Sequence, residues 1–444
     1  MKKYNNYKDS DVEWIGKIPS HWIMQRIDWV SKIVRGNTAF KKDELLDAGE
    51  YIALQYGKTY KVDVVDDSFN FYVNSEFFNE SQVTTKGDTI LISTSETIED
   101  LGHTCFYNNQ NVGLLGGEQI LLKPNRKFLH EKYLYHYSRQ FGSELRRYAR
   151  GLKVFRFNTS DLKQLFIAIP TLEEQLSIAN YLDNKTSQID HLISKKEKFI
   201  KLLEEERVAV INQAVTKGLD PNVPMKDSGV EWLGEIPEHW EVKRLKFIGN
   251  SIGGLTYSPN DIVESSSEGV LVLRSSNIQN GKLSLKDNVY VNLKISDKLT
   301  LKKGDILICS RNGSQHLIGK NICIDEQMEG NTFGAFMMIF RSNNWKFLSH
   351  YFNSSIFTSQ SGLFLTATIN QLTSNTLNNF FIAIPKSNDE QILIAEYIDN
   401  KTHEIDCIIN KSVQEIELLK EYKTALISEV VTGKVDVSTS STQV

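Results

Sequence analysis

Residues 12–22 read VEWIGKIPSHW and residues 230–240 read VEWLGEIPEHW, with eight of the eleven positions identical. Two further stretches recur in the same order. FIAIP stands at 166–170 and again at 381–385, and IANYLDNKT at 178–186 returns as IAEYIDNKT at 394–402. The offset between the copies is 218 residues at the start and 215 to 216 near the end. This long repeat predicts two similar folding units in tandem, because solenoid repeats are much shorter and more numerous.

The two copies resemble each other unevenly along their length. Their ends match well, whereas the middles, roughly residues 40–85 and 258–300, can barely be aligned. A shared frame with divergent middles predicts one architecture that presents two different recognition surfaces, although neutral drift in loops would leave the same pattern. Two like units related by a rotation also suit a ligand with an approximate two-fold axis of its own, such as duplex DNA.

Length and composition are those of a globular protein with at least two domains. The chain has 444 residues, of which 40% are hydrophobic and 24% are charged, and its net charge of −4 gives no global basic field. Eleven basic and three acidic residues nevertheless lie between Lys123 and Lys163, while the matching stretch of the second copy carries only Arg341 and Lys346 as charges. The basic run is therefore a feature of the first copy, and it indicates either nucleic acid or an ordinary solvated helix face.

Cysteine usage and the N-terminus predict a cytoplasmic protein. The four cysteines are scattered, with no Cys-x-x-Cys pair, which indicates reduced thiols rather than a disulfide frame or a zinc site. The N-terminus has no apolar leader segment, and no stretch reaches 18 apolar residues, so we expect neither secretion nor a membrane span.

Each copy divides into a strand-rich first part and a helical second part. Short runs of β-branched and aromatic residues, bounded by turn residues, recur in residues 1–170 and 218–385. We interpret each of these parts as an α+β domain with a mixed or antiparallel sheet. Short helices are expected around residues 130–150 and 345–362, and they flank the sheet.

A long helix is predicted after each sheet, over residues 171–217 and 386–434. Thr171 followed by Glu174 fits an N-cap with a capping box, and Gly218 and Gly433 stand where C-cap glycines belong. Apolar residues recur at a spacing of seven, broken into three and four, at the same positions of both copies. These are Leu182, Ile189, Leu192, Ile193, Ile200, Leu203, Val210 and Ala214, and Ile398, Ile405, Ile408, Ile409, Ile416, Leu419, Leu426 and Val430.

Each predicted helix covers roughly 40 residues, or roughly 60 Å, which is too long for one small domain to cover. We therefore expect the two helices to pair as an antiparallel coiled coil that joins the two domains by a pseudo-two-fold repeat. The alternative is that each helix packs on its own sheet. Residues 435–444 are predicted to be a flexible tail.

No catalytic set is recognisable in the sequence. There is no P-loop, no Asn/Asp-Pro-Pro-Tyr/Phe quartet, and no histidine spacing that suits a metal. Glu-x-Lys occurs at residues 241–243 and 421–423 without a convincing upstream aspartate, so it is interpreted as surface charge. His21 and His239 recur within Pro-x-His-Trp turns, where we expect them to cap or to pack. No catalytic residue and no metal ligand are predicted.

These motifs together resemble the specificity subunit of type I restriction-modification systems. The resemblance rests on the Trp-Ile/Leu-Gly-x-Ile-Pro-x-His-Trp opening and on the stretch that begins at Glu174-Gln175 and at Glu390-Gln391 and ends with Ile189-Asp190 and Ile405-Asp406. The helix ends, VTKG at 215–218 and VTGK at 431–434, also fit the family's Val-Thr-Gly-Lys, with the last two residues exchanged in the first copy. The resemblance covers nearly the whole chain.

The resemblance implies a function and a set of partners. Residues 1–170 and 218–385 would be target recognition domains that read the two parts of a bipartite, asymmetric DNA sequence, and the helices would be the spacer between them. The subunit would have no catalysis and no cofactor of its own. Two modification subunits, which bind S-adenosylmethionine, would methylate adenine, and two restriction subunits would use ATP and Mg for translocation and cleavage of double-stranded DNA.

Polar loops that follow the recurring strands are the candidates for DNA contact. Arg, Asn and Gln side chains can pair bidentately with guanine and adenine edges, and Glu can accept from cytosine, although simple solvation of a loop explains any single residue equally well. The candidates are Gln55, Tyr56, Lys58, Thr94, Ser95, Glu96, Arg150, Lys153, Arg156 and Asn158 in the first copy, and Arg274, Asn277, Arg311, Asn312, Ser314, Gln315, Thr368, Asn370 and Gln371 in the second.

Two rival functions remain open from the sequence alone. One is a DNA methyltransferase or nuclease with a diverged catalytic site. The other is a coiled-coil scaffold with no connection to DNA. A methyltransfer assay on the isolated chain separates the first rival from the specificity subunit, and salt-sensitive binding to any duplex would count against the second.

Overall fold

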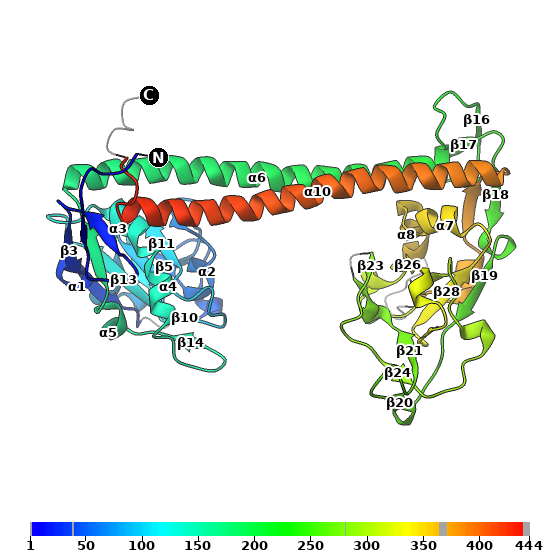
Figure 1. Ribbon diagram of the computed structural model, residues 1–444, viewed down its shortest axis with the longest axis horizontal. Helices are drawn as coiled ribbons and strands as arrows, with labels where there is room; N and C mark the ends of the chain where they lie inside the picture. The colour runs from blue at the N-terminus through cyan, green and yellow to red at the C-terminus, as the bar shows by residue number, and fades with distance from the viewer. Residues whose placement is uncertain (1, 38–39, 280, 364–370, 438–444) are drawn as a thin grey trace. The chain divides into compact units, whose positions relative to one another are not determined.

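The computed structural model describes residues 2–37, 40–279, 281–363 and 371–437 (Figure 1). The chain forms two compact units, each of which contains the sheet domain of one copy of the repeat and segments of both long helices. Unit 1 consists of residues 1–196 and 414–444, and unit 2 of residues 197–413. Unit 1 is therefore discontinuous in sequence, whereas unit 2 is a single segment.

Unit 1 carries the first α+β domain. Its strands are β1 (Tyr7–Asp9), β2 (Lys17–Pro19), β3 (Ile23–Arg26), β4 (Ser31–Arg35), β5 (Tyr51–Leu54), β6 (Val64–Val65), β7 (Tyr72–Val73), β8 (Val83–Thr84), β9 (Thr89–Ile92), β10 (Thr94–Ser95), β11 (Thr104–Tyr107), β12 (Gly113–Leu115), β13 (Gln119–Pro124), β14 (Phe155–Arg156) and β15 (Phe166–Ile169). Its short helices are α1 (Ile27–Val30), α2 (Tyr56–Thr59), α3 (Glu131–Ser138), α4 (Phe141–Arg146) and α5 (Thr159–Leu162).

Unit 2 repeats this domain with variations. Its strands are β16 (Met225–Asp227), β17 (Glu235–Pro237), β18 (Glu241–Arg244), β19 (Asn250–Gly253), β20 (Ile262–Val263), β21 (Val270–Leu273), β22 (Ile278–Gln279), β23 (Lys282–Leu283), β24 (Tyr290–Val291), β25 (Ile306–Cys309), β26 (Asn321–Cys323), β27 (Thr332–Phe333), β28 (Met337–Arg341) and β29 (Phe381–Ile384). Its short helices are α7 (Trp345–Phe352), α8 (Ser355–Leu363) and α9 (Ser374–Asn378).

The main sheets of the two units have the same order in four strands, and that of unit 1 has β6 as an additional edge strand. In unit 1 the order is β4-β13-β9-β11-β6, and in unit 2 it is β19-β28-β25-β26. All neighbours in these sheets are antiparallel except β11 and β6. A second sheet in each unit contains one parallel pair, β12 with β5 and β27 with β21. The prediction of α+β domains with mixed sheets and short flanking helices is confirmed, because α3, α4, α7 and α8 lie in the expected ranges.

Two long helices begin where the sheets end, as the sequence predicts. Helix α6 runs from Leu172 to Lys217 and helix α10 from Asn388 to Val431. In unit 1 the start of α6 and the end of α10 run in opposite directions, because Asp190 pairs with Lys423 at 2.7 Å while Lys196, further along α6, pairs with Glu415. In unit 2, Arg207 of α6 contacts Asp406 of α10 at 3.2 Å. A coiled coil over the full length of both helices stays a prediction.

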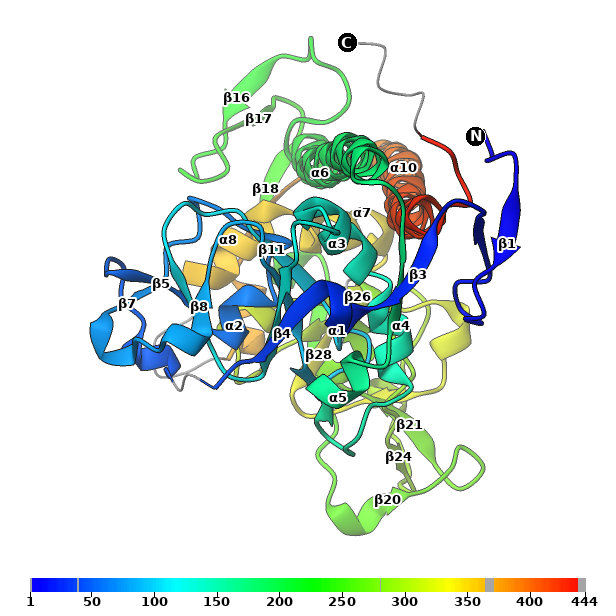
Figure 2. The same ribbon diagram turned by 90° about the vertical axis from the view of Figure 1, so that its left-hand side faces the viewer.

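The apolar stripes of the helices contribute to the cores of both units. Leu182, Ile189, Leu426 and Val430 lie in the core of unit 1. Both helix segments of that unit lie along one side of its sheets (Figure 2). Two equivalent stripe residues, Leu192 and Ile408, remain 42% exposed, because they stand at the edge of the stripe. The helix segments therefore pack on the sheet domain as well as on each other.

A buried tryptophan connects the opening motif to the long helix in each unit. Trp22 and Trp240 are fully buried, and their indole nitrogens donate hydrogen bonds to Glu174 at 3.1 Å and to Glu390 at 2.9 Å. His21 contacts Glu174 at 3.0 Å. The predicted capping box is therefore only half correct. Thr171 accepts the backbone N–H of Glu174, but the Glu174 carboxylate is engaged by the opening motif.

The last described residues are part of the core of unit 1. The predicted flexible tail began at residue 435, but Val435 is 7% and Val437 2% exposed, so the prediction is wrong for this stretch. Gly433 takes φ +72° at the end of α10, and a Cβ there would lie 2.3 Å from the ring of Pro19. This tight turn directs Val435 and Val437 into the core, where they join the opening motif.

A His–Asp pair attaches a short helix to a long helix in each unit. His136 of α3 contacts Asp183 of α6 at 2.8 Å, and His350 of α7 contacts Asp399 of α10 at 3.2 Å. Burial lowers the pKa of His136 despite its bond to Asp183. Burial raises the pKa of Asp183, but hydrogen bonds from His136 and Lys132 outweigh it and lower the pKa overall. Both groups therefore favour the folded state when His136 is neutral and Asp183 is ionised.

We expect unit 1 to lose stability as the pH falls below about 6.5, the ordinary histidine pKa. The folded-state pKa of His136 is depressed, so the unfolded state takes up the proton first, at up to about 1.4 kcal/mol per pH unit. Asp183 adds a loss in the same direction at lower pH. Urea unfolding at several pH values measures this slope. His136→Gln should flatten it around pH 6, and an unchanged slope would contradict the assignment.

Among the described residues, none of the helices has both the length and the apolar character needed to traverse a bilayer.

Candidate nucleic-acid interface

Each unit has a cleft at the same edge of its main sheet. The cleft of unit 2 has a volume of about 980 Å³, and that of unit 1 about 600 Å³. The first is lined by residues 255–257, 274–276, 311–313 and 334–337. The second is lined by Arg35, Ser93, Thr94, Glu118, Ile120, Arg150, Gly151, Val154 and residues 156–159. Both lie at equivalent strand boundaries, where β9 ends and β13 begins in unit 1 and where β25 ends and β28 begins in unit 2.

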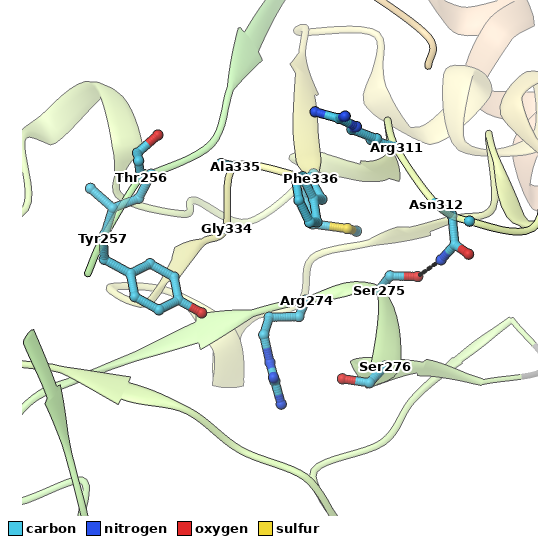
Figure 3. A pocket seen from close by; sticks show the side chains of 13 residues that line it. Thr256, Tyr257, Arg274, Ser275, Ser276, Arg311, Asn312, Gly334, Ala335 and Phe336 are labelled. Atoms are coloured by element: carbon cyan, nitrogen blue, oxygen red, sulfur yellow. Dashed lines mark hydrogen bonds between the residues drawn. The ribbon is translucent and has the colours of Figure 1, made fainter. Parts of the chain in front are cut away.

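The cleft of unit 2 presents two arginines beside aromatic rings (Figure 3). The guanidinium of Arg311 lies over the ring of Phe336, 5.4 Å from its centroid. Arg274 is held at 2.8 Å by Asp287. Asn312 donates a hydrogen bond to Ser275 Oγ at 3.0 Å. The positive charge and the apolar wall together suit a planar, electron-rich group such as a base edge.

Buried polar atoms without partners also occur in the cleft of unit 2. Within the described residues, the Nε of Arg274 and the Oγ of Ser276 are buried and make no hydrogen bond. Both residues line the cleft. Because a buried donor without a partner is costly, these atoms mark the cleft as a place where a ligand or water completes the hydrogen bonding.

Two arginines of the unit 1 cleft form ion pairs, and its aromatic lining residue, Phe157, is buried. Arg156 approaches Glu118 at 3.5 Å, and Arg150 approaches Asp161 at 3.4 Å. Glu118 has φ +66°, a conformation that costs energy for a residue with a side chain. Residues held in such conformations cluster at binding sites, where the surrounding structure imposes them. The cleft thus offers both a carboxylate and guanidinium groups to a ligand.

The two clefts are built on one backbone frame with different side chains. In unit 1 the backbone N–H of Ser93 donates to the carbonyl of Glu118 at 3.1 Å, and in unit 2 that of Ser310 donates to the carbonyl of Phe336 at 2.9 Å. Glu118 and Phe336 are therefore equivalent, and so are the next residues along, Thr94 and Arg311. The side chains at the centre of the two clefts therefore differ, at positions outside the divergent middles of the two copies.

Only some of the predicted contact residues lie in these clefts. Those that line them are Thr94, Arg150, Arg156 and Asn158 in unit 1, and Arg274, Arg311 and Asn312 in unit 2. Ser314 does not line the cleft of unit 2. Four other candidates are exposed but line neither cleft, and these are Glu96, Lys153, Gln315 and Gln371. The backbone of Gln371 pairs with that of Arg311. Thr368 and Asn370 lie outside the described residues.

Three of the predicted residues have structural roles. Asn277 is fully buried, and its side chain accepts from Arg274 N and donates to Ser284 O, which removes it from the candidate contacts. Ser95 is 3% exposed within β10, which removes it as well. The side-chain oxygen of Asn158 caps helix α5 by accepting from two backbone N–H groups. The sequence alone does not distinguish side chains that hydrogen-bond their own backbone in this way from side chains that contact DNA bases.

A separate group surrounds helix α2 in unit 1. Tyr56 stacks on Tyr60 with 5.5 Å between ring centroids, and Lys58 lies 4.2 Å from the ring centroid of Phe71. Gln55 is the residue before α2, and its backbone carbonyl oxygen accepts the N–H groups of Lys58 and Thr59. Burial raises the pKa of Tyr56, so its hydroxyl stays protonated at neutral pH. This aromatic and basic surface does not line the cleft of unit 1.

The basic run of the first copy does not form one basic face. Seven of its eleven cations pair with carboxylates of unit 1, three of which lie within the run itself. The pairs are Lys123 with Asp88, Arg126 with Glu131, Lys132 with Asp183, Arg139 with Asp63, Arg147 with Glu144, Arg150 with Asp161 and Arg156 with Glu118. Only the stretch from Arg150 to Arg156 stands at the cleft.

Several residues of the clefts were not predicted from the sequence. Arg35, Glu118, Tyr257 and Phe336 reach them from segments far apart in the chain. The Gly116-Gly117 pair before Glu118 was the only local signal, since it precedes the unusual φ. The described residues contain no group of three or more His, Cys, Asp or Glu placed to hold a metal ion.

Comparison with known proteins gives a consistent result. A family model described as the type I restriction modification DNA specificity domain matches residues 19–202 and 237–418. A putative specificity subunit of the type I restriction enzyme MjaX from Methanocaldococcus jannaschii is 26% identical over 452 residues, covering 98% of each chain. The specificity subunit of the enzyme MjaVIII from the same organism is 25% identical and covers 95% of this chain and 94% of its own.

Solved structures share the fold. One, from a study of complex assembly and conformational transition in the type I R-M system, aligns with a TM-score of 0.72 at 16% identity, covering 94% of this chain and 99% of that chain. The HsdS subunit from Thermoanaerobacter tengcongensis aligns with a TM-score of 0.56 at 16% identity, covering 94% and 98%.

Proposed function

The chain belongs to the family of type I restriction modification DNA specificity domains, which it contains twice, and from this we propose that it is the DNA-recognition subunit of a type I restriction-modification complex. Each unit reads one part of a bipartite target. The chain itself performs no catalysis, and its partners are double-stranded DNA and the modification and restriction subunits. S-adenosylmethionine, ATP and Mg belong to those partners.

One observation carries this function: two clefts on one frame with different reading groups. Unit 1 offers Thr94 and Glu118, whereas unit 2 offers Arg311 and Phe336 at the equivalent places. Side chains that differ at equivalent positions recognise different base edges, and two readers of this kind require an asymmetric target. A single catalytic centre would not require two such clefts.

Methylation profiling of DNA from cells that carry this chain with its modification subunits tests the function. The expected result is adenine methylation at one bipartite site with two unlike halves. The isolated chain with S-adenosylmethionine and that target should transfer no methyl group. Methylation by the isolated chain would support the rival function of a methyltransferase, and an absence of any sequence-specific methylation with partners would refute a DNA-recognition subunit.

Arg311→Ala should relax one half-site and leave the other unchanged. Loss of a bidentate contact to a base costs about 1–3 kcal/mol at that position. The relaxed position appears as additional methylated sequences in the profile. Lys294→Ala removes an exposed cation of unit 2 outside the cleft and serves as the matched control. Equal loss at both half-sites would mean that Arg311 holds phosphate instead.

Deleting residues 197–203 and 410–416 together should change the gap between the half-sites but not their sequences. The deletion removes seven residues from each of two continuous helices, α6 and α10, and preserves the heptad register. Seven helical residues span about 10.5 Å, which corresponds to about three base pairs of duplex. The methylation profile gives the new gap directly. An active deletion variant with the original gap would contradict the spacer role.

A further inference from the structure

A short hairpin of unit 1 projects an apolar tip beside the cleft. It runs from Arg150 to Arg156, which exchange two backbone hydrogen bonds of 3.0 Å each. Gly151 has φ +118°, and a Cβ there would lie 1.9 Å from the carbonyl oxygen of Val154, so only glycine fits the bend. Strand β14 of the hairpin pairs with β10. The glycine bend and the pairing with β10 therefore fix the conformation of this hairpin.

Leu152 at the tip is 99% exposed, the largest exposed fraction among the large apolar side chains that the structure describes. Val154, on the same hairpin, is 37% exposed. Single exposed leucines are ordinary on protein surfaces, but Leu152 has almost no contact with the rest of the unit. Transfer of such a side chain out of water gains about 1.5–3 kcal/mol, and Leu152 makes none of that gain within unit 1.

Three cations lie on the same hairpin as this apolar tip. Lys153 follows Leu152 directly. Arg150 and Arg156 stand at the base of the hairpin, where their side chains remain 73% and 62% exposed although each approaches a carboxylate, Asp161 and Glu118. The hairpin lies on the side of unit 1 away from α6 (Figures 1 and 2). The corresponding stretch of the second repeat, residues 365–371, reads LTATINQ and contains no basic residue. The combination of a bare leucine with flanking cations is thus peculiar to the first repeat.

We propose, on the premise that the chain is a DNA-recognition subunit, that Leu152 is a wedge that inserts between two stacked base pairs at the first half-site. Apolar wedges partly unstack a base step and kink the duplex, while nearby Arg and Lys side chains hold the phosphates on either side. Arg150, Lys153 and Arg156 stand where those phosphates would be held. The apolar gain of Leu152 offsets part of the unstacking cost.

The wedge has a consequence for specificity. Pyrimidine–purine steps such as TA and CA/TG unstack most readily, so a wedge selects them without a hydrogen bond to any base. We therefore expect such a step within or directly beside the first half-site. The second half-site should be read without this distortion, because its cleft uses Arg311 and Phe336 and its repeat lacks the cations. The bound DNA is then kinked at one half only.

Base unstacking in the complex of the full chain with its modification subunits tests the wedge. The probe is a duplex that carries the target recovered by methylation profiling. Permanganate reactivity reports unstacked thymines, and 2-aminopurine placed at adenine positions reports unstacked adenines. The variants are Leu152→Ala, the conservative Leu152→Met, and Leu418→Ala as a matched control, since Leu418 is a 63% exposed leucine on α10 of the same unit.

The wild-type complex should show one unstacked step at the first half-site and none at the second. Leu152→Ala should return the reactivity to that of free duplex and weaken binding about tenfold. Leu152→Met should retain the distortion, and Leu418→Ala should behave as wild type. Because Leu152 touches almost nothing within the chain, folding is not at risk in these variants.

Four outcomes overturn the wedge. Specific binding without any unstacked base refutes it and leaves the recognition function intact. Unstacking that persists in Leu152→Ala assigns the distortion to another residue. Failure of Leu152→Ala to assemble with the modification subunits would make Leu152 a protein contact. An absence of sequence-specific binding by the wild-type complex refutes the recognition function itself, and the wedge with it.

Discussion

A chain that begins at Met225 is expected to fold, to pair with a second copy of itself and to direct methylation to a palindromic site. Strand β16 begins at Met225 and opens the second repeat as β1 opens the first. Residues 225–444 contain one complete recognition domain and one long helix. With modification subunits, the expected target consists of two copies of the second half-site in opposite orientation.

The pairing is possible because the ends of the two long helices are equivalent. Ile211, Ala214 and Val215 of α6 are buried in the core of unit 2. The equivalent residues of α10, which are Ile427, Val430 and Val431, are buried in the core of unit 1. In the shortened chain, the end of α10 from one copy can take the place of the missing end of α6 on the other. Val430 is larger than Ala214, so some repacking accompanies the exchange.

Light scattering and methylation profiling measure this result. The fragment should have twice the mass of its chain, and Val430→Asp, which places a charge in the pairing surface, should make it monomeric. A monomeric fragment would contradict the equivalence of the helix ends. Methylation of the original asymmetric site would contradict the assignment of unit 2 to the second half-site.

Trp22→Ala is expected to destabilise unit 1 by about 3–5 kcal/mol, a large fraction of the stability of a domain. The indole of Trp22 is fully buried, and it donates to Glu174. Its removal leaves a cavity and also leaves the Glu174 carboxylate with one donor fewer. Hydrogen exchange measured by mass spectrometry should show faster exchange of amides throughout residues 1–196 and in the last turns of α10.

Trp240→Ala is the matched variant for unit 2, because Trp240 is equally buried and donates to Glu390. It should accelerate exchange in residues 197–413 and leave unit 1 protected. Trp22→Phe retains an aromatic ring and should cost about 1–3 kcal/mol, mostly the lost hydrogen bond and the smaller volume. Equal effects of either alanine variant on both units would show that the units do not unfold separately.

The repeat, the sheet domains and the long helices could be predicted because local patterns specify them. Seven-residue spacing places Leu182 and Ile189 on one face of α6 whatever the rest of the chain does. Pro170 and Gly218 mark the limits of the helix, and α6 runs from Leu172 to Lys217. Short apolar runs between turn residues likewise located β9 and β25. These features need no knowledge of distant contacts.

Features that depend on distant contacts could not be predicted. Glu174 has the sequence of a capping-box residue, but Trp22, 152 residues away, engages its carboxylate. Asn277 is of a residue type that reads bases and follows a predicted strand, yet its side chain makes its hydrogen bonds to the backbone of its own loop. Glu118 belongs to the cleft only because β13 lies beside β9. Tertiary contacts therefore decide whether a polar loop side chain has a structural role or faces the cleft, and residue type and spacing alone do not reveal those contacts.

The discontinuity of unit 1 sets an order of events during synthesis on the ribosome. Unit 2 is complete once residue 413 has emerged, whereas the core of unit 1 needs Leu426, Val430, Val435 and Val437 from the extreme C-terminus. The first repeat is synthesised first, but its core is completed last. Its apolar surface stays uncovered while more than two hundred further residues are translated. Chains released between residues 413 and 426 would therefore hold a finished second reader and an unfinished first one, and they would depend on chaperones to prevent association through that surface.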